Sequence, residues 1–432
     1  MKTVLVVSPH FPPVSAADMH RARISLPHFR SFGWKPLVLA VAPQYVETVT
    51  EPLLVNTLPD DVPVYRVPAL PAQMTRKVGL GSLGLRAFPF LYKRGCRIIR
   101  QHRVNLIYFS TTMFPTLPLG RLWKRKFGLP FVIDMQDPWL SEYHENRPGA
   151  PKPPKYWAAA RMHRILEPWT MQATSGLVAV SADYIQTLRR RYARLNNVPA
   201  TVLPFGAAES DFDVVRANPQ SNRFFRPNDG KIHGVYLGRG GADMASALRI
   251  IFEALKRGVQ EKPHLYSRVK LHFVGTDYAP EHRARKTIQP VANEFGMLPY
   301  VEEHPARIPY FEGLQLLLDG DFLIVPGSDD PQYTASKIFP YILARRPLLA
   351  LFNEKSSVCQ IVRETASGEV LGFKPGVDSD SYCAELYRLW TDILSRLPFE
   401  PQTDWRAFEA YTARELARKQ SELFEEVLSN EK

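Results

Sequence analysis

Residues 319–352 read DGDFLIVPGSDDPQYTASKIFPYILARRPLLALF, and this stretch indicates the fold more clearly than any other. It predicts a buried strand (322–325), a polar loop, a helix (333–344) and a second buried strand (348–351). Units of this kind build open parallel α/β sheets. Such sheets bind phosphate-bearing ligands where a loop leaves the carboxyl end of a strand and a helix begins. Lys337 lies about one turn into the expected helix, within reach of an anion held over the loop.

The same alternation of strand and helix patterns runs through the rest of the chain. Continuous β-branched and leucine runs are typical of strands buried on both faces of a parallel sheet. The sequence therefore predicts two Rossmann-like, doubly wound α/β domains that face each other across a cleft. The expected strands are 3–7, 37–41, 64–67, 106–110, 131–134 and 177–180 in the first domain, and 234–237, 269–274, 322–325, 348–351 and 369–371 in the second.

The domain boundaries follow from the same pattern. An N-terminal domain is expected over residues 1–205 and a second domain over residues 232–400. The polar, turn-rich segment 206–231 has no sustained period, and we interpret it as a linker. Residues 401–432 complete the chain with a long helix, for which Asp404 is the expected N-cap.

Composition excludes several classes of protein. The 432 residues are 45% hydrophobic and 23% charged, which is typical of a globular chain. No apolar run approaches the ~20 residues that span a membrane, and the run at 4–7 is too short for a signal peptide. The three cysteines are too far apart to predict disulfide bonds or a metal cluster. These features predict a cytoplasmic protein.

Charge is distributed unevenly along the chain. Residues 1–205 carry 27 lysines and arginines against 11 aspartates and glutamates, a net +16, while the remainder carries 28 against 32, a net −4. This imbalance indicates an anionic partner for the first half, such as an anionic membrane surface or a lipid-linked substrate. A solvated basic face remains an alternative, and we expect no nucleic-acid partner. The basic patches are Arg76 and Lys77; Lys93, Arg94, Arg97, Arg100 and Arg103; Lys124, Arg125 and Lys126; and Arg189, Arg190 and Arg191.

Several segments, in order, resemble the GT-B glycosyltransferases of the retaining, family 4-like type (glycosyl transferases group 1). The resemblance implies the GT-B fold, with an acceptor-binding first domain, a nucleotide-sugar-binding second domain and a last helix that returns to the first domain. The segments are VLVVSPHFPPVSAADMHRARISLPHFRSFGWKPLVLA (4–40), FVIDMQDPWL (131–140), LEPWTMQATSGLVAVSADYIQTL (166–188), ATVLPFGAAESDFD (200–213), GVYLGRGG (234–241) and the stretch 319–352.

The resemblance also implies a donor site in the second domain. Sugar transfer leaves a nucleoside diphosphate, whose developing negative charge must be stabilised. The family holds it with an arginine and a lysine, which Arg239 and Lys337 match here. Because these cations supply the positive charge, no metal and no cofactor are expected. The expected donor-binding residues are Gly238, Arg239, Gly240, Gln332, Ser336 and Lys337.

Acceptor-side candidates follow the first and fifth expected strands. Asp134 and Asp137 lie three residues apart, and Asp137 is the preferred carboxylate to orient or deprotonate an acceptor hydroxyl. His10 follows the first strand, and Arg21 could meet an acceptor phosphate from the first helix. The alternatives are capping for the aspartates, a buried satisfied histidine, and an exposed helix arginine.

Two departures from the family pattern bear on activity. Ser15, Ala16 and Ala17 stand where many members have a glycine pair close to the donor phosphate. Gln332 and Pro340 stand where many members have two glutamates that contact the sugar and the ribose. Pro340 offers no side chain to a ribose, and it also interrupts the expected helix.

The sequence therefore predicts a glycosyltransferase of hexosyl type. It would move a sugar from a nucleotide-sugar to a glycan or lipid-linked acceptor in surface polysaccharide or glycoconjugate synthesis, with a peripheral contact at the inner membrane face. Two alternatives stay open: a catalytically silent GT-B binding protein and a GT-B-fold nucleotide-sugar epimerase.

Overall fold

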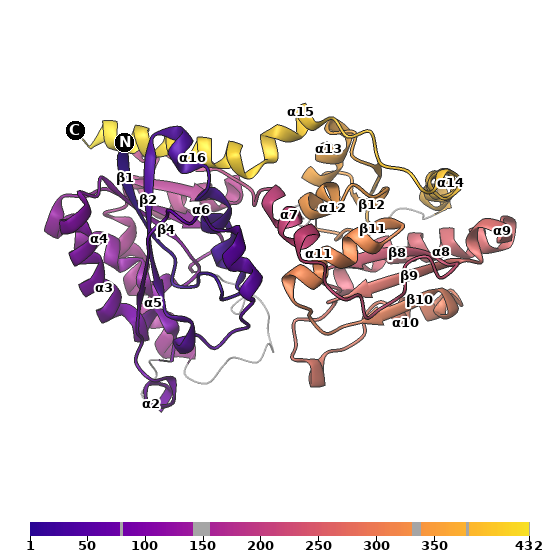
Figure 1. Cartoon of the computed structure of the whole chain (residues 1–432), viewed down its shortest axis with the longest axis horizontal. Coiled ribbons are helices and arrows are strands. Elements are labelled where there is room, and N and C mark those ends of the chain that lie inside the picture. The colour runs from indigo at the N-terminus through magenta and orange to yellow at the C-terminus, as the bar shows by residue number, and fades with distance from the viewer. Residues whose placement is uncertain (78–80, 141–155, 331–337, 377–379, 432) are drawn as a thin grey trace. The chain divides into compact units, whose positions relative to one another are not determined.

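The computed structural model describes residues 1–77, 81–140, 156–330, 338–376 and 380–431. The chain forms two compact units, each built on one parallel sheet (Figure 1). Unit 1 consists of Met1–Gly206 and Ala413–Lys432, and unit 2 of Ala207–Thr412. No helix among the described residues is long and apolar enough to cross a membrane.

Unit 1 contains a seven-stranded sheet in the order β3-β2-β1-β4-β5-β6-β7, with every pair parallel. The central strand β1 places Leu5 opposite Leu37 of β2 and Ile107 of β4, and all three side chains are fully buried. The six strands expected from apolar runs in this half are present, and the short edge strand β7 begins the segment 200–213, where only the family resemblance indicated a strand. The strands are β1 (Lys2–Val7), β2 (Trp34–Val41), β3 (Val64–Val67), β4 (Leu106–Ser110), β5 (Phe131–Met135), β6 (Gly176–Ala179) and β7 (Ala200–Val202).

Helices cover both faces of this sheet. The first helix was expected over 18–32 but ends early, since Pro27 has no N–H to make the next helical hydrogen bond after that of Leu26 to Ala22. The chain then forms a 3₁₀ turn that Gly33 ends in the left-handed conformation at φ 81°. The helices are α1 (His20–Ser25), α2 (Ala72–Lys77), α3 (Leu83–His102), α4 (Pro118–Phe127), α5 (Tyr156–Met171) and α6 (Ala182–Arg191), with 3₁₀ segments Ala17–Met19, Phe29–Phe32, Pro43–Tyr45, Pro52–Thr57, Phe114–Thr116 and Ala193–Asn197.

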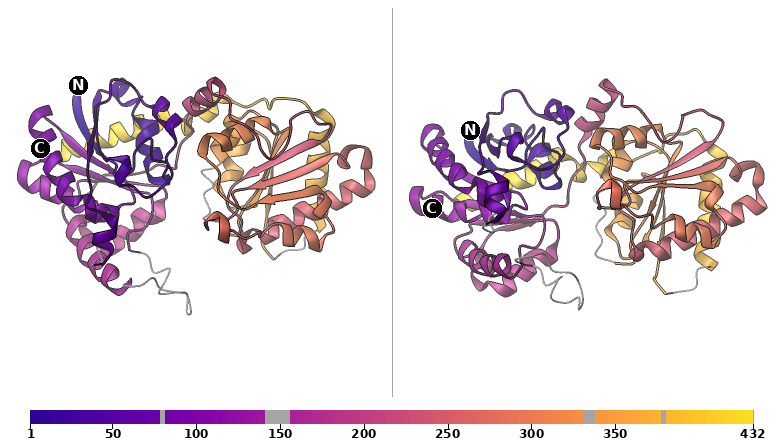
Figure 2. Two further views of the ribbon diagram at one scale, coloured as in Figure 1. Left: turned by 60° about the horizontal axis from the view of Figure 1, so that its bottom comes forward. Right: turned by 90° about the horizontal axis from the view of Figure 1, so that it is seen from below.

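The C-terminal helix α16 (Ala413–Asn430) packs on unit 1, beside α1 and the strands β6 and β7 (Figures 1 and 2). Its side chain Phe424 is fully buried, with its ring centroid 5.8 Å from that of Phe29, 5.3 Å from that of Trp34 and 5.2 Å from that of Tyr108. The amide of Gln420 donates to Ser25 Oγ at 2.8 Å. Helix α16, at the end of the chain, therefore completes the hydrophobic core of unit 1, which begins at the N-terminus.

Shortening Phe424 tests how strongly α16 holds unit 1. Phe424→Leu leaves a cavity among the three aromatic rings, and we expect it to lower the free energy of unfolding by about 1–2 kcal/mol. The measurement is denaturant unfolding of the full chain. Glu426→Ala, on the exposed side of the same helix, is the matched control. An equal effect of both variants would show that the ring cluster does not hold the helix.

Unit 2 contains a six-stranded parallel sheet in the order β10-β9-β8-β11-β12-β13. The five strands expected in this half are present, and β10 was not expected because its sequence, VEEH, lacks an apolar run. The strands are β8 (Ile232–Leu237), β9 (Val269–Val274), β10 (Val301–His304), β11 (Phe322–Pro326), β12 (Leu348–Asn353) and β13 (Glu369–Phe373).

Two helical segments of unit 2 differ from expectation. Residues 209–217 were assigned to a linker, but they form α7 (Glu209–Ala217), whose buried Phe212 and Val215 give it an apolar side. The expected helix 404–429 is two helices, because Thr412 is extended (φ −69°, ψ 155°) between α15 (Trp405–Phe408) and α16. Asp404 caps α15 as expected, accepting from the amides of Arg406 and Ala407. The other helices are α8 (Ala245–Glu261), α9 (Pro263–Tyr266), α10 (Gln289–Glu294), α11 (Tyr310–Asp319), α12 (Ile338–Leu343), α13 (Ser357–Glu364) and α14 (Asp380–Arg396), with 3₁₀ segments Ala242–Met244, Glu281–Arg283, Leu298–Tyr300 and Glu409–Tyr411.

Candidate functional site

Each sheet reverses its strand order once, between β1 and β4 in unit 1 and between β8 and β11 in unit 2. At such a reversal the loops that follow the two strands diverge, and ligands of open α/β sheets bind there. The two candidate sites are therefore the loops after β1, β4 and β5 in unit 1 and the loops after β8 and β11 in unit 2.

An aspartate and a histidine form a pair at the reversal point of unit 1. His10 Nδ1 lies 2.8 Å from Asp18 Oδ1, and Asp18 Oδ2 accepts from Thr111 Oγ1 at 2.8 Å and from the amide of Thr112 at 3.1 Å. Burial alone would raise the pKa of Asp18, but the hydrogen bonds from His10 and the two threonines outweigh it and lower the pKa below its ordinary value. An ionised Asp18 fixes Nδ1 of His10 as the protonated nitrogen. The other ring nitrogen, Nε2, then carries the lone pair.

Asp137, which follows β5, is the second acid at this point. Asp137 is exposed, and no described residue donates a hydrogen bond to its side chain. Partial burial of its carboxyl group raises the pKa of Asp137, and the charge of Asp18 raises it further. An exposed carboxylate with a raised pKa is suited to accept a proton.

Asp134 and Arg21 do not lie at the surface of the site, so the expectation that their side chains bind the acceptor is wrong. Both side chains have an exposed fraction of 0%, and Arg21 Nε lies 2.8 Å from Asp134 Oδ2. The Arg21 guanidinium also donates to the carbonyl oxygens of Leu203 (2.7 Å) and Pro204 (3.1 Å). Ser110 and Gln136 donate to Asp134 Oδ2 at 3.0 and 2.8 Å. The pair therefore connects α1, β5 and the end of β7 inside unit 1.

The hydrogen bonds to Asp18 predict a pH-dependent loss of stability in Asp18→Asn. Because its pKa in the folded chain lies below the unfolded value of about 3.9, Asp18 stabilises the fold above that pH and loses this effect as the pH falls through the folded pKa. We expect Asp18→Asn to cost about 1–3 kcal/mol at pH 7. Denaturant unfolding should show that the difference in the free energy of unfolding between the original chain and Asp18→Asn becomes smaller below about pH 4. Asp61→Asn at an exposed position is the control, and a difference independent of pH would contradict the prediction.

In unit 2 the loop after β8 carries the expected arginine, but this side chain has an acidic partner. Arg239 binds Asp243 through two contacts, NH1 to Oδ1 at 2.9 Å and NH2 to Oδ2 at 2.5 Å. Ser328, after β11, donates to Asp243 Oδ2 at 2.6 Å. The hydrogen bonds from Arg239 lower the pKa of Asp243 to about 2. Asp243 thus joins the loops on the two sides of the reversal point.

The glycines after β8 are required by close packing. A Cβ at Gly238 would lie 2.5 Å from the hydroxyl of Tyr236, and one at Gly240 would lie 2.2 Å from Thr287 Oγ1. Gly240 also donates its N–H to the carbonyl of Thr276 at 2.7 Å. Below this loop, Tyr341 of α12 bonds through its hydroxyl to both the amide and the carbonyl of Leu237. The backbone after β8 is thereby held close to neighbouring elements.

Three expected donor-binding residues, Gln332, Ser336 and Lys337, lie outside the described residues. Pro340 is described, within α12, where its carbonyl accepts from the amide of Ala344. A hollow of about 500 Å³ lies after β12, lined by residues including Lys355 and Arg363. It is one strand further from the reversal point than β11, so we do not assign it to the site.

The basic patches of unit 1 are of two kinds. Many cations have partners: Arg191 pairs with Glu167 at 2.6 Å, Lys124 binds Glu431, and Arg189 donates to two carbonyls. On α3 and α4, by contrast, five exposed cations have no acidic partner among the described residues, and some of them contact aromatic rings of the same unit. We call this surface the basic ridge. It consists of Lys93, Arg97, Arg100, Arg125 and Lys126.

Sequence reasoning missed Asp18 and Asp243. The spacing of Arg239 and Asp243, four residues apart, could have indicated their pairing. The contact of Asp18 with His10 and Thr111 had no such signal, since it joins residues 8 and 93 positions apart.

Residues 26–206 match the family model described as the glycosyl transferase 4-like domain. Among solved structures, Anabaena Alr3699/HepE in complex with UDP is 17% identical, with a TM-score of 0.56 over 99% of this chain and 100% of that chain. A UDP-forming α,α-trehalose-phosphate synthase from Burkholderia vietnamiensis is 12% identical, with a TM-score of 0.56 over 99% and 100%. A glycosyltransferase from Rickettsia africae is 14% identical, with a TM-score of 0.55 over 99% of each chain. No curated protein matches at a significant level.

Proposed function

We propose that this chain, which has the GT-B fold and carries a glycosyl transferase 4-like domain, transfers a sugar from a nucleotide-sugar to a glycan or lipid-linked acceptor. The observation that carries the proposal is the pair of candidate sites at the reversal points of two parallel sheets, in a chain whose first unit matches this domain. In the proposal, unit 2 binds the donor and unit 1 the acceptor.

The donor site would form around the loops after β8 and β11. Arg239, Lys337 and Ser336 would bind the diphosphate beside the backbone of Gly238 and Gly240, and Gln332 would contact the sugar. Arginine has five N–H donors, so binding of a diphosphate does not require the ion pair with Asp243 to break. The solved relatives in complex with UDP and UDP-glucose favour a uridine nucleotide. These cations make a metal or cofactor unnecessary for charge stabilisation.

The acceptor site would form around His10 and Asp137. Asp137 would orient the acceptor hydroxyl or accept its proton, and Nε2 of His10, fixed by Asp18, would accept a hydrogen bond from the sugar. Retention, hexosyl transfer and a role in surface polysaccharide or glycoconjugate synthesis rest on the resemblance to the family. The basic ridge on α3 and α4 supports a cytoplasmic enzyme in peripheral contact with an anionic membrane.

Calorimetric titration of the full chain with UDP, GDP, ADP and CMP tests the donor site. We expect micromolar binding of one nucleotide, weakened at least about 10-fold by Lys337→Ala or Arg239→Ala, since each removes a charge-assisted hydrogen bond of about 1.5–3 kcal/mol. Lys256→Ala, at an exposed position of α8, is the control and should bind as tightly as the original chain. If no nucleotide binds to folded protein, the donor site is refuted.

A catalytically silent binding protein is the second candidate. It is favoured by the acidic partner of Arg239 and by Gln332 and Pro340 in place of the family's glutamates. Single-turnover release of nucleotide from the sugar donor, with and without lipid-linked acceptors, separates the candidates. A transferase releases nucleotide faster with acceptor. A silent protein releases none, and an epimerase changes the sugar without needing acceptor.

A further inference from the structure

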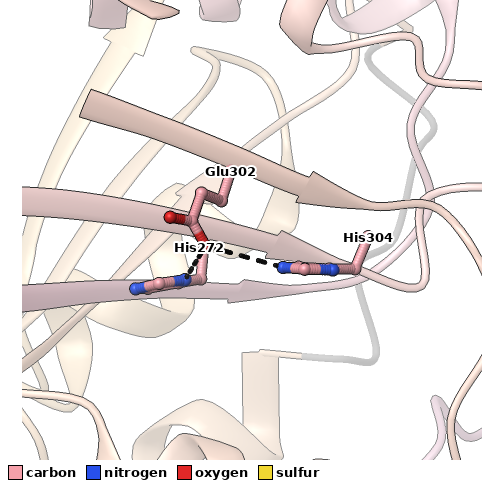
Figure 3. Close-up of side chains that lie close together, drawn as sticks. All are labelled: His272, Glu302 and His304. Atoms are coloured by element: carbon pink, nitrogen blue, oxygen red, sulfur yellow. Dashed lines mark ion pairs between the residues drawn. The ribbon is translucent and has the colours of Figure 1, made fainter. Parts of the chain in front are cut away.

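Three side chains of unit 2, on two neighbouring strands, have nitrogen or oxygen atoms that lie close together and could bind one metal ion (Figure 3). His272 lies on β9, and Glu302 and His304 lie on the edge strand β10, where Glu302 pairs with His272 in the register. Oε2 of Glu302 lies 3.7 Å from Nδ1 of His272 and 3.8 Å from Nε2 of His304. The three ligand atoms all lie within 4.8 Å of one another.

A hydrogen-bonded chain sets the tautomer of His272. His233 Nε2 lies 3.1 Å from the carboxylate oxygen Oδ1 of Asp229, and His233 Nδ1 lies 3.0 Å from His272 Nε2. Because a carboxylate only accepts, Nε2 of a neutral His233 carries the proton and its Nδ1 accepts. With His233 in this neutral form, His272 donates from Nε2 and presents the lone pair of Nδ1 to Glu302. Both rings are only 2% exposed and pack on Phe225.

Two of the three ligand atoms lack a hydrogen bond. His272 Nδ1 and His304 Nε2 are both buried atoms with no hydrogen-bond partner among the described residues. A buried ring nitrogen without a partner is unfavourable in free energy. A metal ion bound between these two nitrogens and the Glu302 carboxylate would give both of them a partner.

We propose that His272, Glu302 and His304 bind a divalent transition-metal ion of the zinc class. Two imidazoles and one carboxylate are a ligand set that Zn²⁺ prefers, whereas Mg²⁺ and Ca²⁺ prefer oxygen. In a tetrahedral zinc site, bonds of about 2.0–2.1 Å separate neighbouring ligand atoms by about 3.4 Å. The carboxylate oxygen already lies at 3.7 and 3.8 Å from the two nitrogens, and all three atoms lie within 4.8 Å of one another, so the side chains would have to move closer by at most about 1.5 Å.

The surroundings fit a metal site that ties β10 to β9. Lys270 Nζ lies 3.7 Å from Oε1 of Glu302, so this lysine pairs with one carboxylate oxygen while Oε2 faces the histidines. The chain from Asp229 through His233 orients the His272 ring, as outer hydrogen-bond partners do for metal-bound histidines. Three protein ligands leave at least one coordination position for water. The site lies on the two outer strands, away from the β8–β11 reversal point, and does not depend on the proposed transferase activity.

Zinc titration of the metal-free, untagged full chain tests the proposal. Calorimetry should show one Zn²⁺ per chain with a micromolar or lower dissociation constant, and the melting temperature should rise by a few degrees. Co²⁺ in the same site should give visible d–d absorption without a thiolate charge-transfer band, since no cysteine belongs to the site.

Variants separate this site from nonspecific binding. His304→Ala and the nearly isosteric Glu302→Gln are at partly exposed positions, which limits their effect on folding. Each should weaken zinc binding by about 100-fold. His233→Phe should weaken it by about 10–100-fold through the lost hydrogen bond to His272. His282→Ala, an exposed histidine of the same unit, should leave it unchanged. The proposal is overturned if the folded chain binds no Zn²⁺ or Co²⁺, or if both ligand variants bind like the His282 control.

Discussion

Replacing Arg21 with alanine is expected to lower the free energy of unfolding of unit 1 by about 3–5 kcal/mol. The reason is that Asp134, also with 0% exposure, would lose the cation that now lies 2.8 Å away. Burial already raises the pKa of Asp134 and Arg21 opposes this rise, so without Arg21 the carboxyl group must hold an unpaired charge or take up a proton, and both cost free energy. The carbonyl oxygens of Leu203 and Pro204 would lose their donor as well. Denaturant unfolding of the full chain, followed by circular dichroism, measures the change.

Two further variants decide whether the buried charge is the cause. Arg30→Ala removes an exposed ion pair with Asp61 in the same unit and should cost no more than about 1 kcal/mol. The double variant Arg21→Met, Asp134→Leu removes both charges, and it should be less destabilised than either single variant. If the double variant lost the sum of the two single losses, the pair would not be coupled and the explanation would be wrong.

Asp137→Asn is expected to lower the rate of sugar transfer by about 10²–10⁴-fold while leaving nucleotide affinity unchanged. Asparagine keeps the size of the side chain but cannot accept a proton. Donor binding belongs to unit 2 in the proposed function, whereas Asp137 belongs to unit 1. Nucleotide release with acceptor measures the rate, and calorimetry with the nucleotide measures the affinity.

The pH profile adds a second readout for Asp137. Because the pKa of Asp137 is raised by burial and by Asp18, the rate should begin to fall at a higher pH than an ordinary aspartate would give. This acid limb should disappear in Asp137→Asn. Asp183→Asn, at an exposed position in the first turn of α6, should keep both the rate and the limb. A fall in nucleotide affinity instead of rate would place Asp137 outside the role proposed for it.

The strands could be predicted from sequence because strands buried on both faces must be continuously apolar. All eleven strands expected from apolar runs are present, and the two further strands, β7 and β10, are short edge strands without such a run. Helix ends were harder to predict. Pro27 ended the first helix early, and the extended Thr412 divided the last one. Local chain geometry at single residues decided these boundaries.

The site residues show where sequence reasoning fails. Strand ends gave the positions of His10, Asp137 and Arg239 correctly, since loops after parallel strands meet at one edge of the sheet. The pattern did not show that Arg21 points into the core, because the partner that keeps it there, Asp134, is 113 positions away. It also gave no sign that ring nitrogens of His272 and His304 both lie close to Glu302, which depends on the register of β9 and β10.

The sequence by itself thus determined the two doubly wound sheets and the loops that hold the candidate site residues. It could do so because the apolar periodicity of strands and helices, and their alternation along the chain, are local patterns. Only the tertiary structure decided which charged side chains are exposed and which are paired. That difference arises because the free energy of a charge depends on its burial and on partners brought together by folding, and neither is a local property of the chain. Arg21, Asp18 and His272 are the residues for which this mattered most.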